Sequence, residues 1–325
     1  MSKVCLYVSD VLGAYGFPGG HPFGTDRQQA FWRETVRQGL DRKVSLCEGG
    51  IATRTELERF HTPRYLDRVR MLSDTGLGFI DGGDTPAFVG VYEAAAAVVG
   101  AALAGLARVM TNGANEANDA HDCARTFQPI GGLHHARRDA AAGFCVFNDI
   151  GIVIETLRAQ HRVKRIAYID IDVHHGDGVF YSYQDDPDLI FADIHEDGHY
   201  LYPGTGGADE TGRGKAKGTK LNIPLRPGAG DKEFFAAWEK AEALLTKYKP
   251  EFFLFQCGAD SLAGDPLAHL NYSEATHAHA ARRLRILADR YAGGRIMGFG
   301  GGGYNRKNIA EAWNAVLAEF ITTSA

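Results

Sequence analysis

The sequence predicts an α/β fold in which helices cover both faces of a parallel β-sheet. Short apolar runs alternate along the chain with longer segments of helical periodicity, as in successive βα units. Several of the short runs are apolar at successive positions, which is typical of strands buried on both faces. The 325 residues include 45% hydrophobic and 23% charged ones, ordinary proportions for a globular domain. We therefore expect one domain spanning residues 1–325.

The strands are expected where these apolar runs occur. A run close to the N-terminus gives the first strand, and a further strand is expected around Phe127. The later runs end in or beside Gly, Asp, His or Cys, where a loop begins. In chain order the runs are Lys3–Val8, Arg165–Ile171, Leu189–Ile194, Lys220–Ile223, Phe252–Gln256 and Arg295–Phe299.

Helical periodicity fills the intervals between the strands. The segment from Pro86 to Met110 is rich in alanine, begins with proline and follows Asp84, as a helix N-terminus often does. Ligands of such folds bind beyond the carboxyl ends of the strands, and the reactive residues of this chain occur there. The predicted helices are Asp26–Leu40, Pro86–Met110, Asn148–Gln160, Asp231–Tyr248, Ser273–Tyr291 and Asn308–Phe320.

The composition argues against some classes of protein. A formal net charge of −5 disfavours a general nucleic-acid or membrane-surface binder, because such proteins usually carry a basic excess. No apolar run approaches the roughly 18 residues that cross a bilayer, and the N-terminal run is too short for a signal peptide. Five scattered cysteines without framework spacing predict reduced thiols and hence a cytoplasmic protein.

A dense group of metal-ligand residues follows the strand that begins near residue 165. Residues two apart on a strand share a face, so Asp170, Asp172 and His174 lie on one side. Asp172 and His174 supply two ligands, and a catalytic zinc site usually has three with one open position. Asp260 directly follows another buried strand and is the best third ligand. The alternative for Asp260 is a helix cap.

Paired histidines indicate acid–base chemistry beside the metal. His134 and His135 follow the strand around Phe127, and burying two imidazoles requires a partner for each nitrogen. Asp170 and Asp177 are the natural partners, because a carboxylate that binds one ring nitrogen raises the basicity of the other. A structural metal pair or a satisfied core pair is the alternative.

A glycine-rich loop after the last strand indicates an electrophile. Four consecutive glycines precede Tyr304 and allow close approach of the backbone to a ligand. The phenol can donate a hydrogen bond to a developing oxyanion. A phosphate loop is the alternative, but no Lys-Ser/Thr pair follows the glycines. Phe144 and Tyr202 lie in two other strand-end loops and suit a slot for a methylene chain, unless they are ordinary core aromatics.

Together these motifs resemble the histone deacetylase family of the arginase–deacetylase fold, nearly end to end. They read Gly-Gly-Leu-His-His-Ala, Gly-Phe-Cys-Val-Phe-Asn-Asp, Asp-Ile-Asp-Val-His-His-Gly-Asp-Gly, Tyr-Pro-Gly-Thr-Gly, Gly-Ala-Asp-Ser-Leu-Ala-Gly-Asp-Pro and Gly-Gly-Gly-Gly-Tyr-Asn. His21-Pro22-Phe23 and the segment 127–132 are most similar to the bacterial acetoin-utilisation branch. The resemblance implies a single three-layer domain with a central, mostly parallel eight-stranded sheet.

The resemblance also implies a role for each site residue. One Zn²⁺ would be bound by Asp172, His174 and Asp260, with Fe²⁺, Co²⁺ or Mn²⁺ as substitutes. His134 and His135, backed by Asp170 and Asp177, would form the catalytic dyad, and Tyr304 would polarise the carbonyl. Substrate-binding and channel positions would be Asp84 at the rim, Gly143, Phe144, Tyr202, Leu267 and Gly302 in the tunnel, and Arg27 in an acetate channel.

Structural potassium is a further implication of the resemblance. A first ion would use Asp170, the carbonyls of Asp172 and His174, and the loop at Asp193 and Ile194, where serine is usual in place of Asp193. A second ion would lie among Tyr183, Asp186, Leu189 and Thr219.

The expected reaction is hydrolysis of an N-acylated lysine or related amine by metal-activated water, releasing acetate. An acetylpolyamine or other small-molecule amide hydrolase is the alternative. Leu267 is apolar where a polyamine-selective branch has glutamate, which disfavours polyamines. The acidic run His195–His199 near the mouth is suited to attract a cationic substrate, and the alternative is a solvated loop. A non-catalytic acyl-lysine-binding protein and a two-metal arginase-like enzyme fit the dyad and tyrosine less well.

Overall fold

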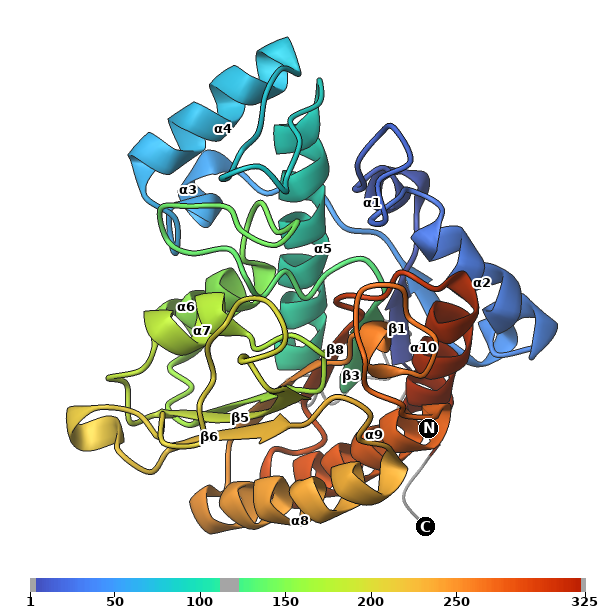
Figure 1. Cartoon of the computed structure of the whole chain (residues 1–325), viewed down its shortest axis with the longest axis vertical. Coiled ribbons are helices and arrows are strands. Elements are labelled where there is room, and N and C mark those ends of the chain that lie inside the picture. The colour runs from blue at the N-terminus through green and yellow to red at the C-terminus, as the bar shows by residue number, and fades with distance from the viewer. Residues whose placement is uncertain (1–3, 112–122, 323–325) are drawn as a thin grey trace.

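Eight parallel strands form one sheet through the middle of the molecule (Figure 1), in the order β2-β1-β3-β8-β7-β4-β5-β6. The computed structural model describes residues 4–111 and 123–322. The strands are β1 (Val4–Tyr7), β2 (Ser45–Cys47), β3 (Arg125–Gln128), β4 (Ile166–Asp170), β5 (Leu189–Glu196), β6 (Lys220–Leu225), β7 (Phe252–Gln256) and β8 (Ile296–Phe299). All of their pairings are parallel. The predicted fold class is therefore confirmed, with a sheet that is wholly rather than mostly parallel.

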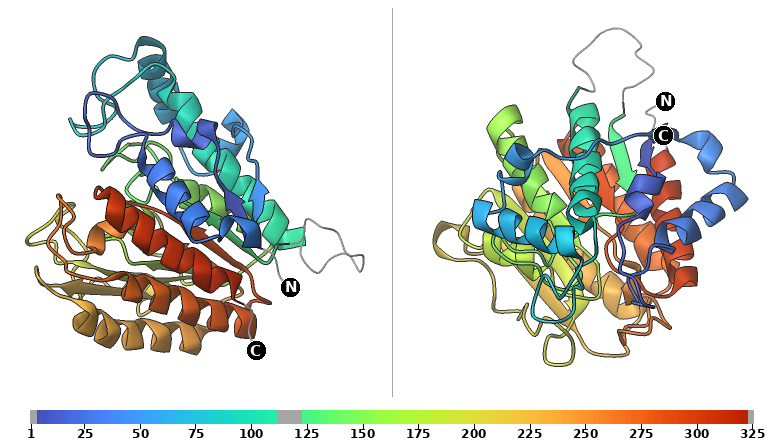
Figure 2. Two further views of the ribbon diagram at one scale, coloured as in Figure 1. Left: turned by 90° about the vertical axis from the view of Figure 1, so that its right-hand side faces the viewer. Right: turned by 90° about the horizontal axis from the view of Figure 1, so that it is seen from above.

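Helices cover both faces of the sheet (Figure 2). Along β4, Ile166 and Tyr168 belong to one apolar core, whereas Ala167 and Ile169 belong to the other, because successive side chains point to opposite faces. The first core packs against α1 (Asp10–Gly13), α3 (Arg54–Leu57), α4 (Pro63–Thr75), α5 (Val91–Thr111), α6 (Asp149–His161) and α7 (Asp177–Ser182). The second packs against α2 (Arg27–Arg37), α8 (Asp231–Tyr248), α9 (Glu274–Tyr291) and α10 (Arg306–Ile321). Short 3₁₀ turns lie at Asp41–Lys43, Gly214–Ala216 and Ala259–Ser261.

Helix α5 begins at Val91, five residues after the predicted start at Pro86. The reason is local. Pro86 forms an isolated antiparallel bridge with Phe79, and Oδ1 of Asp81 accepts hydrogen bonds from the backbone N–H groups of residues 83–85. These bonds close a turn in place of a first helical turn. Asp84 therefore lies in that turn and does not cap the helix.

Helix α5 is long and apolar enough to span a membrane, which the sequence did not lead us to expect. It is the one such helix among residues 4–111 and 123–322, and 67% of its most apolar window is buried inside the protein. Its alanine-rich surface contacts α6 and the sheet. This burial is that of a core helix in a globular domain.

Two of the five cysteines are not free thiols. Cys5 of β1 and Cys123, two residues before β3, form a disulfide, whereas Cys47, Cys145 and Cys257 are free and buried. The expectation of five reduced thiols is therefore wrong for this pair. Strands β1 and β3 are neighbours in the sheet, which brings residues 118 apart in sequence together. The cytoplasmic location that was inferred from reduced thiols stays a prediction.

The sheet order brings the reactive loops together. Strands β3, β8, β7 and β4 lie side by side, and in a parallel sheet their carboxyl ends meet at one edge. The loop after β3 carries the paired histidines, the loop after β8 carries Tyr304, the 3₁₀ turn after β7 carries Asp260, and the loop after β4 carries Asp172 and His174. These four loops form the candidate site.

Candidate active site

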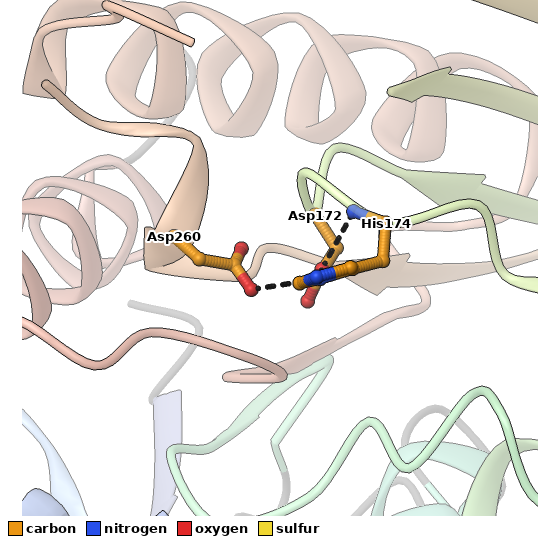
Figure 3. A group of neighbouring side chains, drawn as sticks. All are labelled: Asp172, His174 and Asp260. Atoms are coloured by element: carbon orange, nitrogen blue, oxygen red, sulfur yellow. Dashed lines mark hydrogen bonds and ion pairs between the residues drawn. The ribbon is translucent and has the colours of Figure 1, made fainter. Parts of the chain in front are cut away.

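Asp172, His174 and Asp260 converge on one point (Figure 3). Nδ1 of His174 lies 3.1 Å from Oδ1 of Asp172 and 3.2 Å from Oδ2 of Asp260. One ligand atom from each residue lies within 4.8 Å of the others. All three side chains are buried, and no other such cluster occurs among the described residues. The predicted ligand set is thus spatially coherent, with Asp260 in a 3₁₀ turn and not at a helix cap.

The donor set fits a divalent cation. Oδ2 of Asp260 is buried and lies 3.2 Å from Nδ1 of His174, whereas its Oδ1 accepts from the backbone N–H of Val173 at 3.1 Å. Burial and the charge of Asp172 raise the pKa of Asp260 to about 7. Burial lowers the pKa of His174, but hydrogen bonds with Asp172 and Asp260 outweigh it and raise that pKa to about 10. Without a metal ion, the negative charge of the two buried carboxylates favours protonation of the triad. A bound divalent cation would neutralise the same charge.

Two glycines make room for the ligands. A Cβ atom on Gly302 would lie 2.1 Å from Oδ2 of Asp260, and one on Gly258 would lie 2.0 Å from Oδ2 of Asp172. Both distances are far inside van der Waals contact. Gly302, predicted as a tunnel residue, therefore lies directly against the metal ligands.

Gln256 holds the ligand Asp172 in place and was not among the predicted site residues. Its Nε2 donates to Oδ2 of Asp172 at 2.8 Å, while its Oε1 accepts from the N–H of Gly258 at 2.8 Å. The same Nε2 lies 3.3 Å from the carbonyl of Gly132, in the loop that leads to the histidines. Gln256 is fully buried, and the signal for it was a polar residue at the end of an otherwise apolar strand.

We expect Gln256→Leu to weaken metal binding by about 10- to 100-fold, the usual cost of losing a residue that orients a ligand. Leucine removes the donor to Asp172 and leaves the N–H of Gly258 unpaired. Competition with a chromophoric chelator measures the affinity, and Gln160→Leu, at an exposed position of α6, is the control. An affinity within about twofold of wild type would contradict this role.

The paired histidines form two imidazole–carboxylate couples, as predicted. Nδ1 of His134 lies 2.7 Å from Oδ2 of Asp170, and Nδ1 of His135 lies 2.7 Å from Oδ1 of Asp177. The two Nε2 atoms are 3.0 Å apart. If both Nδ1 atoms donate to carboxylates, the Nε2···Nε2 contact is a hydrogen bond only when one ring is an imidazolium, because a neutral ring that donates through Nδ1 has a bare Nε2 acceptor. The geometry thus allows the pair to accept one additional proton and share it between the two Nε2 atoms.

The surroundings of the dyad bias its charge. Burial and the neighbouring His134 lower the pKa of His135 to about 4, so this ring is neutral at pH 7. Arg137 donates to Oδ2 of Asp177 at 2.8 Å and was not predicted as a site residue. Burial opposes ionisation of Asp177, but the bonds with His135 and Arg137 lower its pKa to about 2. Asp177 is therefore a fixed anion behind His135.

Asp149 shapes the loop that carries the histidines. Its two carboxylate oxygens accept from the N–H groups of Gly132 and Leu133, both at 2.8 Å. Burial raises its pKa to about 6. Its position in the Phe-Asn-Asp motif was noticed in the sequence, but the partner loop lies 16 and 17 residues away and could not be read there.

Tyr304 is held from both sides of its loop. Arg27 donates to the carbonyls of Gly303 at 2.9 Å and Gly301 at 2.5 Å, and Oδ2 of Asp265 accepts from the N–H of Tyr304 at 2.8 Å. Burial and the nearby Asp260 and Asp172 raise the pKa of the phenol well above its ordinary value. The hydroxyl therefore stays protonated and remains a hydrogen-bond donor.

Arg27 is predicted to line an acetate channel. It is fully buried, and its guanidinium lies 3.9 Å from the centre of the Phe23 ring. Its Nη1 has no partner, so one donor group is left for an anion. The structure shows an anchor for the tyrosine loop, and the channel stays a prediction.

Two predicted substrate-binding residues, Gly143 and Gly302, line a narrow cavity at the dyad, and the rings of Phe144 and Tyr202 contact other residues of its lining. Gly143 has a φ of +52°, and a Cβ there would lie 2.5 Å from the His135 ring. The ring of Tyr202 lies 5.1 Å from that of His135, and the ring of Phe144 lies 5.9 Å from that of Tyr304. The cavity is lined by Phe23, Gly132, Leu133, His134, His135, Gly143, Cys145, Asp172, His174, Gly301, Gly302 and Tyr304.

Two predicted residues lie at the surface near this cavity. Asp84 is exposed and precedes Thr85, whose hydroxyl accepts from the N–H of Phe144 at 3.1 Å. Leu267 is 37% exposed, and its N–H donates to Oδ1 of Asp265. Both positions suit contacts with a substrate outside the metal centre.

Both acidic side chains of the run 195–199 are bound by neighbouring histidines. Glu196 is buried and accepts two hydrogen bonds from His269 at 2.9 Å, and Asp197 binds the N–H and ring of His199. These contacts favour a structural role over attraction of a cationic substrate.

At the first predicted potassium site, the buried Asp193 pairs with the buried His195. Oδ1 of Asp193 lies 2.6 Å from Nδ1 of His195, and Oδ2 accepts from the N–H of Gly176 at 2.8 Å. Burial lowers the pKa of His195, but the charge of Asp193 outweighs it and raises that pKa. The extra charge of Asp193 therefore has an internal partner, beside Asp170 and the buried Ile194. Potassium here stays a prediction.

At the second predicted potassium site the structure places a protein group. The carbonyls of Asp186 and Leu189 accept hydrogen bonds from Nζ of Lys220, which also donates to the hydroxyl of Thr219. The carbonyl of Tyr183 accepts from the N–H of Asp186 at 3.0 Å.

Comparisons with known proteins place this geometry in context. A profile of the histone deacetylase domain matches residues 21–320. Acetoin utilization protein AcuC of Bacillus subtilis is 36% identical over 320 residues, covering 94% of this chain and 79% of its own. Histone deacetylase RPD3 of Saccharomyces cerevisiae is 33% identical, covering 96% and 70%. A histone deacetylase-like amidohydrolase of Pseudomonas aeruginosa is 35% identical over 282 residues, covering 86% and 72%.

Among solved structures, the HDA15 HD domain superposes with a TM-score of 0.88 over 98% of this chain and 88% of that one, at 24% identity. At that identity the match shows the fold alone.

Proposed function

The chain belongs to the histone deacetylase family and is a metal-dependent deacetylase, and within that class we propose that it hydrolyses the amide bond of an N-acylated lysine or a related amine with Zn²⁺ as its ion. The products are acetate, or another carboxylate, and the free amine. Asp172, His174 and Asp260 would hold the ion, since mixed oxygen and nitrogen donors with an open position suit catalytic zinc. Fe²⁺, Co²⁺ and Mn²⁺ suit the same donors.

The residues around the cavity divide the chemistry among them. A bound metal ion supplies a Lewis acid that makes water acidic and polarises the acyl carbonyl. The His134–His135 dyad takes the proton of the attacking water and returns a proton to the nitrogen as the C–N bond breaks. Tyr304 donates a hydrogen bond to the carbonyl oxygen as negative charge develops there. The carboxylates of Asp170 and Asp177 keep both rings oriented.

One observation carries this proposal: two of the three candidate ligands, the dyad and the tyrosine line one cavity, and the third ligand, Asp260, lies 3.2 Å from His174. Oδ1 of Asp172 lies 4.0 Å from Nε2 of His134, and His174 and Tyr304 line the same space. A protein that only bound acyl-lysine would need the pocket but not a relay of two His–Asp couples. A two-metal arginase-like site would need a second set of ligands, and one cluster occurs in the described part of the chain.

The aromatic residues beside the cavity favour an extended, flexible acyl-amine chain as substrate. Phe144 and Tyr202 supply aromatic faces next to the site. The exposed Asp84 precedes Thr85, whose hydroxyl accepts a hydrogen bond from the N–H of Phe144. A carboxylate at that place suits backbone N–H groups of a peptide. Leu267 supplies no charge for the distal ammonium of an acetylpolyamine, which makes that substrate the second candidate.

A substrate screen with and without chelator tests the proposal. We expect the purified protein to release acetate from acetyl-lysine peptides, to lose this activity in a chelator and to regain it on addition of Zn²⁺. Acetylpolyamines and longer acyl-lysine peptides in the same screen decide the substrate class. Activity that is confined to acetylpolyamines would overturn the acyl-lysine assignment, and chelator-resistant activity would overturn the metal role.

A further inference from the structure

Lys220 carries an ammonium group that lies inside the protein. It is the first residue of β6, and its side chain is only 2% exposed, whereas lysine is almost never fully buried unless its charge is paired. Nζ donates to the carbonyl oxygens of Asp186 at 2.7 Å and Leu189 at 2.5 Å, and to Oγ1 of Thr219 at 3.0 Å. An ammonium has three N–H donors, so each donor has an acceptor.

The acceptor oxygens are fixed by bonds of their own. The hydroxyl of Thr219 donates to the carbonyl of Ala216 at 2.8 Å, which leaves its oxygen to accept. The turn that presents the carbonyl of Asp186 is closed by the bond from its N–H to Tyr183 and by the bond from the N–H of Asp188 to its Oδ1. Without a cation, these oxygens would face one another with no donor, which is costly in a buried place.

The ammonium group of Lys220 is stabilised by uncharged oxygen atoms around it and not by direct pairing with a carboxylate. The carboxylate of Asp186 is bound by Arg158, and Nζ of Lys220 contacts carbonyl and hydroxyl oxygens instead. Burial lowers the pKa of Lys220 to about 8, so the ammonium is mostly charged at pH 7. Rings of carbonyl oxygens stabilise potassium ions in the same manner, and ammonium and potassium are similar in size and charge.

We propose that the oxygens of Asp186, Leu189 and Thr219 form a monovalent-cation site that the chain fills with the ammonium group of Lys220. The corner where β5 and β6 begin then needs no dissolved potassium for its stability. The site takes a cation such as K⁺ only when the lysine side chain is removed. This inference concerns stability and does not depend on the proposed catalytic function.

Thermal unfolding of Lys220→Ala in different salts tests the proposal. Alanine removes the ammonium and leaves space at the three oxygens. We expect the Tm to fall by several degrees in choline chloride, and KCl at the same ionic strength to raise it by about 3 °C or more, with a saturable dependence. The change in Tm of the wild type in KCl measures any effect of potassium bound elsewhere. Lys240→Met, which removes an exposed ammonium group of α8, is the matched control.

Three outcomes would overturn the proposal: a Lys220→Ala variant as stable as wild type in choline chloride, a potassium effect of equal size in both proteins, or a loss of stability that KCl does not reduce. The last would show that Lys220 merely caps carbonyls. If the alanine variant is insoluble, Lys220→Ser also leaves space at the three oxygens and is expected to show the same selective gain in KCl. Absence of that gain contradicts the proposal equally.

Discussion

Replacing Tyr304 by Phe is expected to lower kcat by about two to three orders of magnitude, the range seen when one oxyanion donor is removed. The phenol is kept protonated by its buried, anionic surroundings, and it lines the cavity together with His134, His135 and His174. Phenylalanine keeps the ring contacts with Phe23 and Phe144 and removes only the donor. Steady-state kinetics on an acetyl-lysine peptide measure the effect.

Metal content separates this role from a structural one. The Tyr304→Phe variant is expected to bind as much metal as wild type and to unfold at a similar temperature, because the hydroxyl contacts no ligand. Tyr200→Phe removes a hydroxyl from an exposed tyrosine of another loop and is expected to retain full kcat. A Tyr304→Phe enzyme with wild-type kcat would exclude the phenol from the reaction.

Replacing Asp260 by Asn is expected to abolish both metal binding and activity. The change removes one of two anionic ligands and leaves Asp172 and His174 alone, whereas catalytic zinc sites normally use three protein ligands. Asparagine retains the shape, and its oxygen can still accept from the N–H of Val173 as Oδ1 does now. We expect bound zinc to fall from about one ion per chain to less than about one tenth.

Elemental analysis after dialysis measures this loss, and Asp209→Asn, which changes an exposed carboxylate, is the control. Retention of one tightly bound ion per chain in the Asp260→Asn variant would show that Asp260 is not a ligand. Loss of metal with activity retained would show that the reaction does not need the ion.

The fold was predictable where elements are long or uniformly apolar. Strand β7 and helix α8 have the predicted bounds, because four consecutive apolar residues or five turns of periodicity leave little ambiguity. Strand β2 was missed: it has three residues, and Leu46 is 56% exposed. The start of α5 was misplaced because Asp81 closes a turn through hydrogen bonds that no periodicity reveals.

The site was predictable for residues that follow buried strands within dense motifs. The contacts of His134 with Asp170 and of His135 with Asp177 are present as expected, while the catalytic roles of these residues stay predictions. Contacts that join distant segments were not predictable. Examples are Gln256 beneath Asp172, the disulfide between Cys5 and Cys123, and the buried ammonium of Lys220. Each depends on which strands become neighbours, which a single sequence does not specify.

The central claim is that one divalent ion sits between two carboxylates and one imidazole with room for a substrate. Anomalous diffraction at the zinc edge, from crystals grown with zinc, tests it most directly. We expect one peak at about 2.0–2.2 Å from Oδ1 of Asp172, Nδ1 of His174 and Oδ2 of Asp260, with a coordination position facing the cavity. A peak elsewhere, no peak, or an ion enclosed by four protein ligands would contradict the account.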